Sequence, residues 1–353
     1  MALSPITRKK FRRFRSLKRG WWSFLILVAL TVISLFAELI ANSRPLLVRY
    51  DGKTFFPSYG DIIPEKSFGG TQEQETNYRA LQQRFAAEGK GNWVLMPLIP
   101  WNPTETDSQE NVQHPAAPTA ARRHFLGTDK TGRDVLSRLI FGYRNNMLFA
   151  MVYTAGVYLA GIVLGCFMGY AGGKIDLIGQ RIVEIWQSVP FLYIVMIAVS
   201  VMPVGLGFMP RILALLGIMV FFSWMGIAKY MRTNTFKERS RDYTASAQLL
   251  GASTGRIIFH HILPNTLSTL VTFLPFTMAA AISALTALDF LNFGLPPPTP
   301  SWGELLSQGT QNLQAEWIVI SAFSAIAIAL TLVTFTGEAL REAFDPKKFT
   351  TYQ

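Results

Sequence analysis

The chain alternates between long runs of apolar residues and polar segments of varied length. A helix needs about 20 consecutive apolar residues to cross the hydrocarbon core of a bilayer, and several runs approach that length. The pattern predicts an all-helical membrane protein with six transmembrane helices. The expected apolar spans are residues 21–37, 147–171, 191–209, 212–228, 267–288 and 317–337.

Glycine and proline positions add detail to these spans. Gly161, Gly165 and Gly169 recur every four residues, so they share one helix face and allow a neighbouring backbone to approach closely. Pro275 is expected to kink the fifth span. A short turn at 210–211 is expected to join the third and fourth spans.

The polar segments complete the predicted organisation. The parts are a basic N-terminus at 1–20, a first transmembrane helix at 21–43, an insertion at 44–140, a membrane core with helices 2–6 at 141–345, and a tail at 346–353. The insertion is mixed in charge and rich in Pro, Gly and Gln. Its periodicity does not decide between a small folded domain and an irregular excursion.

The distribution of charge predicts the orientation. The chain has a net charge of +11, and its first 20 residues contain eight basic side chains and no acidic one. Because lysine and arginine favour the cytoplasmic side, both termini and the connections 172–190 and 230–265 are expected there, with the insertion outside. This distribution explains the charge without a nucleic-acid partner. The first apolar run is too long for a signal-peptide core and lacks a cleavage site, so it should remain uncleaved.

The sequence predicts no catalytic chemistry. It has no Gly-x4-Gly-Lys-Ser/Thr nucleotide loop, so any ATPase must be another chain. A G-x-S-x-G match at 251–255 lacks the preceding strand that a nucleophile elbow requires. The adjacent His260 and His261 do not face each other as metal ligands would. The single Cys166 lies in an apolar run and is expected to be a packing residue.

Two polar stretches have residue patterns that predict a specific local structure. In the connection 233–265, Gly251 is expected to end a short helix, and a second helical stretch leads to Pro264. Such a compact knob suits docking into a groove on a partner, with an ordinary connector as the alternative. Before the second span, Gly127 and Gly132 allow tight turns. Asp129, Arg133 and Asp134 can pair there, at the outer edge of the membrane. By themselves these residues predict a structural turn.

Both stretches resemble motifs of the permease subunits of ATP-binding-cassette (ABC) importers. The coupling loop of these permeases is matched at Ala247, Gly251, Leu263 and Pro264. Ala245 stands where many families have glutamate, and His261 where they have isoleucine. The peptide and nickel branch favours the form found here, with Asp242, Tyr243, Ala247, Gly251, Ala252 and Ser253. The signature of its C-type subunits is matched at Gly127, Asp129, Gly132, Arg133 and Asp134.

Segments 38–52, 285–296 and 312–315 resemble the permeases of microcin C and oligopeptide importers, so the resemblance covers nearly the whole chain, most loosely over 55–122. It implies a type I importer permease fold with a periplasmic insertion. It further implies that the chain forms half of a translocation pathway for peptides across the bacterial inner membrane. The candidate substrates are oligopeptides, microcin C-like compounds and muropeptides. A permease for nickel or another small solute, and a membrane scaffold without a pore, are the alternatives.

The resemblance also implies the partners. They are a second homologous permease, ABC ATPase subunits that bind ATP and magnesium, a periplasmic solute-binding protein, membrane lipid and the peptide. One ATPase would dock on the coupling loop, and this chain would hold no cofactor or metal. Asp289, near the outer end of the fifth span, is a candidate gate or pathway residue. Its alternative role is a helix-end carboxylate satisfied by the backbone or by a nearby arginine.

Overall fold

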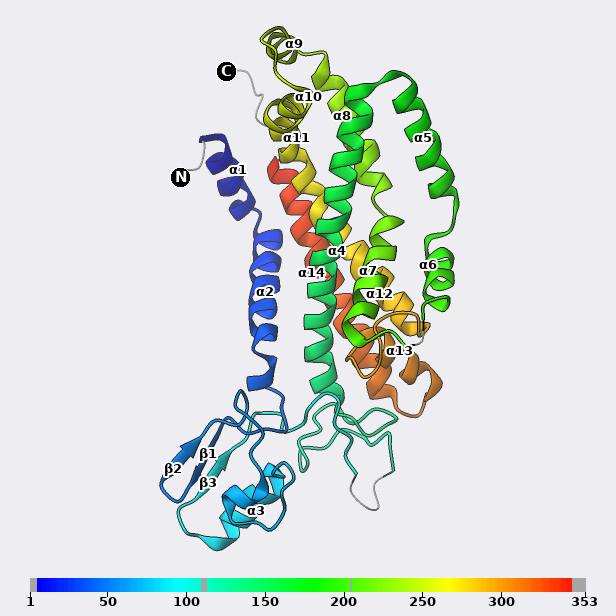
Figure 1. Ribbon diagram of the computed structural model, residues 1–353. Helices are drawn as coiled ribbons and strands as arrows, with labels where there is room; N and C mark the ends of the chain where they lie inside the picture. The colour runs from blue at the N-terminus through cyan, green and yellow to red at the C-terminus, as the bar shows by residue number, and fades with distance from the viewer. Residues whose placement is uncertain (1–4, 109–112, 204, 345–353) are drawn as a thin grey trace.

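The computed structural model describes residues 5–108, 113–203 and 205–344 and is an elongated helical bundle with a small mixed domain at one end (Figure 1). The predicted tail at 346–353 lies outside the described residues. The α-helices are α1 (Pro5–Ser16), α2 (Lys18–Leu35), α3 (Tyr78–Glu88), α4 (Val135–Ala171), α5 (Gly173–Ser188), α6 (Phe191–Ser200), α7 (Phe208–Phe221), α8 (Met225–Arg239), α9 (Asp242–Leu249), α10 (Thr254–Arg256), α11 (Leu263–Leu270), α12 (Leu274–Phe290), α13 (Trp302–Gln311) and α14 (Glu316–Phe344). The strands are β1 (Leu47–Tyr50), β2 (Lys53–Phe55) and β3 (Trp93–Leu95). The short 3-10 helices are η1 (Ala37–Leu39), η2 (Glu65–Phe68) and η4 (Val271–Phe273), and η3 (Ile257–Ile262) is a π-helix.

Within the described residues, four helical segments are long and apolar enough to cross a membrane: α2, α4, Val271–Phe290 and α14. Two bent pairs meet the same criterion when each is taken together. The pair α5 and α6 is bent by 81°, and the pair α7 and α8 by 44°. The described part of the chain therefore contains four candidate crossings, or up to six if each bent pair is one span.

The third and fourth spans differ from their predicted positions. Helix α6 ends at Ser200 and α7 begins at Phe208, so the two helices are not joined at 210–211. Pro203 interrupts the apolar run, whereas Pro210 fits within the first turn of α7, where backbone N–H groups have no helical partner. The predicted connection 172–190 is largely helix α5, which leads into α6. Apolar composition located these segments, but it did not show where the backbone turns.

The longest helices extend beyond their apolar runs. Helix α4 has 37 residues and a rise of about 55 Å, well above the roughly 30 Å hydrocarbon thickness. It begins at Val135, before the predicted start at 147. Pro275 lies in the first turn of α12, directly after the 3-10 helix η4. The expected interruption of the fifth span therefore occurs at the start of α12.

The predicted glycine face of α4 is confirmed as a close helix contact. A Cβ added at Gly161 would lie 2.6 Å from the Cβ of Ile227, and one at Gly169 would lie 2.5 Å from the carbonyl oxygen of Arg232. A side chain at Gly165 would likewise collide with the α8 backbone. Only glycine permits this separation between α4 and α8.

The prediction of an all-helical chain is wrong for the insertion, which we call the insert (residues 44–134). Strand β1 pairs antiparallel with both β2 and β3, in the order β2-β1-β3. Val48 on the central strand is buried in a cluster with Phe68 and with Leu81 and Phe85 of α3. The strands have only three or four residues, too few for an alternating pattern to identify them.

Candidate functional site

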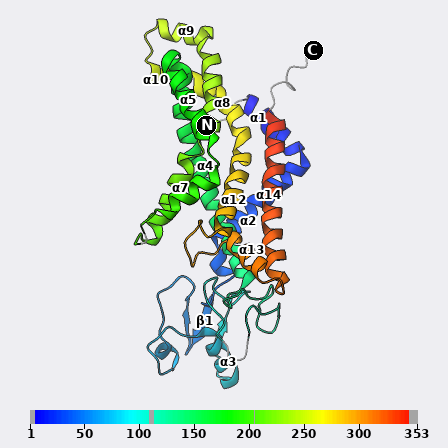
Figure 2. The same ribbon diagram turned by 90° about the vertical axis from the view of Figure 1, so that its right-hand side faces the viewer.

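The two stretches singled out in the sequence lie at opposite ends of the bundle (Figures 1 and 2). Residues 242–262, which we call the connector knob, form the end at which α1 also lies. The other stretch, residues 127–134, is the last part of the insert and lies where the insert meets α13. The two ends are therefore separated by the length of the membrane-spanning helices.

The connector knob has the predicted helix–turn–helix geometry. Helix α9 ends before Gly251, whose φ of +77° is the left-handed conformation that favours glycine. The Gly251 N–H donates to the Gln248 carbonyl at 3.0 Å, and the Ala252 N–H donates to the Ala247 carbonyl at 3.0 Å. Ser253 then caps α10. These contacts reverse the chain within a few residues.

The inner face of the connector knob is anchored to the bundle. Ala247 is buried with Ile257 and Ile262 against Tyr170 of α4. The Tyr243 hydroxyl donates to the Glu238 carboxylate at 2.7 Å. Burial, together with this neighbouring carboxylate, raises the pKa of Tyr243. The inner residues of the motif thus set the position of the knob.

The tip of the connector knob is apolar and faces outward. Leu249 is 89% exposed and Leu250 is 87% exposed. Two adjacent leucines held on a turn in this way present apolar surface that contact with a partner would remove from water. Asp242, Ala245 and Ser253 are also exposed. The G-x-S-x-G match begins directly after helix α9 and so lacks the structural context of a nucleophile elbow.

At the other end, buried and partly buried polar side chains form what we call the carboxylate–arginine network: Asp129, Arg133, Arg138, Glu304 and Gln308. Arg133 donates from Nε to Asp129 at 2.8 Å and from Nη2 to Glu304 at 2.8 Å. Arg138, whose side chain is fully buried, pairs with the same Glu304 and donates to the Pro103 carbonyl at 3.0 Å. Gln308 donates to Glu304 at 2.9 Å. The network ties the start of α4 to α13.

Neighbouring opposite charges in the network determine whether Asp129 and Arg133 are ionised. Burial by itself would raise the pKa of Asp129, but Arg133, Arg138 and several hydrogen bonds outweigh burial and lower it. For Arg133, burial is likewise outweighed by Asp129 and Glu304, which raise its pKa. Both groups therefore remain charged near neutral pH.

The predicted pairing of Asp129 with Arg133 is confirmed, but Asp134 has a different role. Its Oδ1 accepts the Ser137 N–H at 2.6 Å and caps α4, while its Oδ2 lies 2.8 Å from Nδ1 of the buried His124. Gly127 and Gly132 have φ of +71° and +80°, so the expected turns are present. The signature therefore builds the start of α4.

Glu304 and Gln308 were not identified from the sequence, because helix α13 was not predicted. A usable signal exists: Ser301 is followed three positions later by Glu304, the spacing typical of a helix N-terminus. In the structure the Ser301 side chain accepts the Glu304 N–H at 3.4 Å. That signal could have located the helix, but not its ion pairs with residues about 170 positions earlier.

Asp289 is buried near the end of α12 that faces the insert. Its carboxylate accepts the Leu295 N–H at 2.7 Å and the Ser301 hydroxyl at 2.5 Å. A Cβ at Gly303 would lie 2.6 Å from the Asp289 Cβ, so α13 packs directly on this position. These contacts are those of a helix-end carboxylate that holds the following loop. A gating role for Asp289 stays a prediction.

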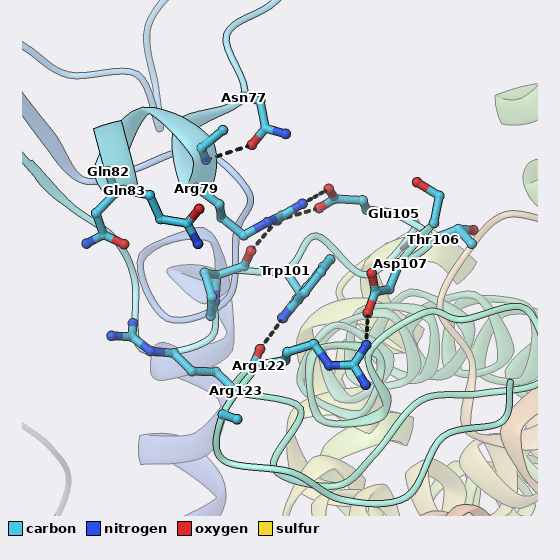
Figure 3. A pocket seen from close by; sticks show the side chains of 14 residues that line it. Asn77, Arg79, Gln82, Gln83, Trp101, Glu105, Thr106, Asp107, Arg122 and Arg123 are labelled. Atoms are coloured by element: carbon cyan, nitrogen blue, oxygen red, sulfur yellow. Dashed lines mark hydrogen bonds and ion pairs between the residues drawn. The ribbon is translucent and has the colours of Figure 1, made fainter. Parts of the chain in front are cut away.

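A polar cleft of about 530 Å³ opens on the insert, between α3 and the chain segments 100–108 and 121–123 (Figure 3). Arg79 lies 3.9 Å above the Trp101 ring and pairs with Glu105. On the other side, Arg122 donates to Asp107 at 2.9 Å. The lining comes from separate segments, which explains why no sequence motif marked it.

Comparison with known proteins gives consistent matches. Residues 161–350 match the family described as "Binding-protein-dependent transport system inner membrane component". The inner membrane ABC transporter permease protein YejE of Escherichia coli K12 is 42% identical over 348 residues, 98% of each chain. The peptidoglycan transport system permease protein YejE of Agrobacterium fabrum is 38% identical over 371 residues, 98% of this chain and 94% of that one.

A more distant relative extends the comparison. The oligopeptide transport system permease protein OppC of Haemophilus influenzae is 32% identical over 262 residues, 72% of this chain and 80% of its own. Three observations indicate the same kind of protein, a membrane permease subunit. They are the similarity along almost the whole chain, the candidate spans, and the family match over more than half of the chain. The chain belongs to the binding-protein-dependent transport system inner membrane component family and is a non-catalytic permease subunit of an ABC transporter in the inner membrane.

Proposed function

We propose that this subunit forms half of the translocation pathway of an ATP-driven peptide importer, with the connector knob docked on an ATPase subunit. The observation that carries the docking is the apolar tip: Leu249 and Leu250 are held almost fully exposed on a knob whose inner face is anchored. Apolar side chains at the centre of a contact contribute most when they enter a closed pocket. ATP binding and hydrolysis in the partner would then act on α8 and α11 through this knob.

The proposed orientation places the connector knob in the cytoplasm and the insert in the periplasm. The basic helix α1 and the basic last turn of α8 lie at the knob end, as expected for the cytoplasmic side. A second homologous permease would complete the pathway. The polar cleft on the insert would form part of the surface that receives a solute-binding protein.

The peptide substrate class is inferred from the relatives. Their names refer to peptidoglycan, oligopeptide and dipeptide transport, and the two with the YejE name align along almost the whole chain, including the insert. We therefore favour oligopeptides, with microcin C-like compounds and muropeptides as specific candidates, over nickel.

The docking is tested by replacing the two tip leucines with serine in Leu249→Ser/Leu250→Ser. We expect recovery of the ATPase with the tagged, gently solubilised subunit to fall on the order of tenfold, because the contact loses its apolar anchors. Peptide uptake by cells should fall in parallel. The matched control is Leu98→Ser/Leu313→Ser, which alters two exposed leucines outside the knob.

Two outcomes would contradict the proposal. Undiminished ATPase recovery with the tip variant would show that the knob tip is not the docking surface. Reproducible isolation of the folded wild-type chain without a second permease or an ATPase would instead favour a scaffold without a pore.

A further inference from the structure

Helix α1 carries an exposed stripe of arginines at the knob end of the bundle. Arg8, Arg12 and Arg15 follow the spacing i, i+4, i+7 and therefore share one helix face, and all three are exposed. Among the described residues, no carboxylate lies within ion-pair distance of these three side chains. The stripe is thus a surface of concentrated positive charge.

Packing on the other side of α1 fixes the direction of this stripe. Phe14 is only 4% exposed and packs with Ala339 and Ala343 of α14. Its ring also meets Trp21 edge-on, with centroids 5.7 Å apart. Because Phe14 is held inward, α1 cannot rotate Arg8, Arg12 and Arg15 towards α14. The break at Leu17, where the backbone leaves helical geometry, separates α1 from α2.

The depth of α1 follows from the length of α2. The 18 residues of α2 rise about 27 Å, close to the roughly 30 Å hydrocarbon thickness, so the end of α1 that adjoins α2 lies at the level of the lipid headgroups. Phe11 and Trp22, on either side of the break, are 52% and 62% exposed. Exposed aromatic rings are typical of the membrane interface.

The position of α1 distinguishes between possible partners. In both views α1 lies at the periphery of the bundle beside α14, away from α9 and α10 (Figures 1 and 2). An ATPase on the connector knob would not need to reach it. We propose that α1 binds the anionic headgroups of phospholipids in the adjacent leaflet, with Arg8, Arg12 and Arg15 contacting phosphate groups. Guanidinium groups bind phosphate with two parallel hydrogen bonds, and Phe11 would lie between the lipids.

The test measures lipid preference directly. The purified full-length chain is placed in phosphatidylcholine vesicles with spin-labelled phosphatidylglycerol or spin-labelled phosphatidylcholine, and the motionally restricted fraction of each lipid is compared. We expect the wild type to prefer phosphatidylglycerol. Arg8→Gln/Arg12→Gln/Arg15→Gln should reduce this preference about fivefold or more, since each arginine near an anionic lipid surface contributes substantially. The preference should also weaken at high salt.

Matched variants separate the stripe from overall charge. Arg49→Gln/Lys53→Gln/Lys90→Gln removes three exposed positive charges from the insert and should leave the preference unchanged. Arg8→Lys/Arg12→Lys/Arg15→Lys keeps the charge and should retain most of it. If the glutamine triple variant does not insert, the three single substitutions should each reduce the preference.

Equal association of both lipids with the wild type, or an unchanged preference in the stripe variants, would overturn the proposal. Loss of ATPase recovery with an unchanged lipid preference would also overturn it, because the stripe would then contact protein.

Discussion

The connector knob and the carboxylate–arginine network both resemble family motifs, yet their side chains are used in opposite ways. In the network, Arg138 and Asp129 are fully buried and paired. In the knob, Leu249 and Leu250 have almost no contact with the rest of the chain. The charges of the network are paired within the folded chain, whereas the two leucines of the knob remain exposed.

Because of this difference, we expect substitutions in the two regions to change different properties: the stability of the fold in the network, and partner binding in the knob. A buried ion pair that loses one member leaves an uncompensated charge, so changes in the network should act on folding. An exposed tip has little to lose within the folded chain, so changes there should act on assembly and transport. A motif recognised in a sequence can thus mark either a set of buried contacts that stabilises the fold or an exposed surface that binds a partner.

The largest expected effect is in the network. Glu304→Gln removes the carboxylate shared by Arg133 and Arg138, and we expect the free energy of unfolding to fall by about 3–5 kcal/mol. The measurement is thermal unfolding of the purified chain in detergent. Glu184→Gln is the matched control, because its partner Arg181 is largely exposed and such pairs contribute little. Equal stability of the two variants would mean that the network does not contribute to the stability of the fold.

A smaller effect, on transport, is expected at the turn of the connector knob. Gly251→Val places a β-branched residue at a φ of +77°, which costs about 1–3 kcal/mol locally and should displace the tip. We expect peptide uptake to fall on the order of tenfold, equivalent to about 1.4 kcal/mol, while the protein remains in the membrane.

The control for Gly251→Val is Gly89→Val in the insert, where φ is +65°. At both positions an added Cβ would have no atom within 4 Å, so the backbone strain is comparable. Uptake reduced equally by both variants would indicate a general loss of protein and not a role of the knob.

The smallest effect concerns pH. Because the pKa of Asp129 is lowered in the folded state, its stabilising contribution is complete above the unfolded value of about 3.9. It is lost as the pH falls through the folded value. Between about pH 8 and pH 5 this contribution is fully present, so Asp129 should cause no change of the thermal midpoint with pH; below about pH 4 the midpoint should decrease. In Asp129→Asn this part of the acid dependence should disappear; parallel curves for the two proteins would contradict the assignment.

Several features of the fold were predictable because they depend on local sequence. Gly161, Gly165 and Gly169 identified a close helix contact from spacing alone, and Gly251 identified a turn from its conformational freedom. The predicted turn at 210–211 was wrong because Pro210 can also occupy the first turn of a helix. The strands of the insert were missed because three or four residues carry too little periodicity.

The sequence by itself was enough to predict a membrane location, the orientation and the family. Apolar runs, basic residues and short motifs are each local features that can be recognised within one segment of the chain. Tertiary structure decided which charges meet. Glu304 reaches Arg133 and Arg138 across about 170 residues, and Trp101 meets Arg79 only after the insert has folded. Such contacts depend on how separate helices pack, and spacing within a single segment carries no information about that packing.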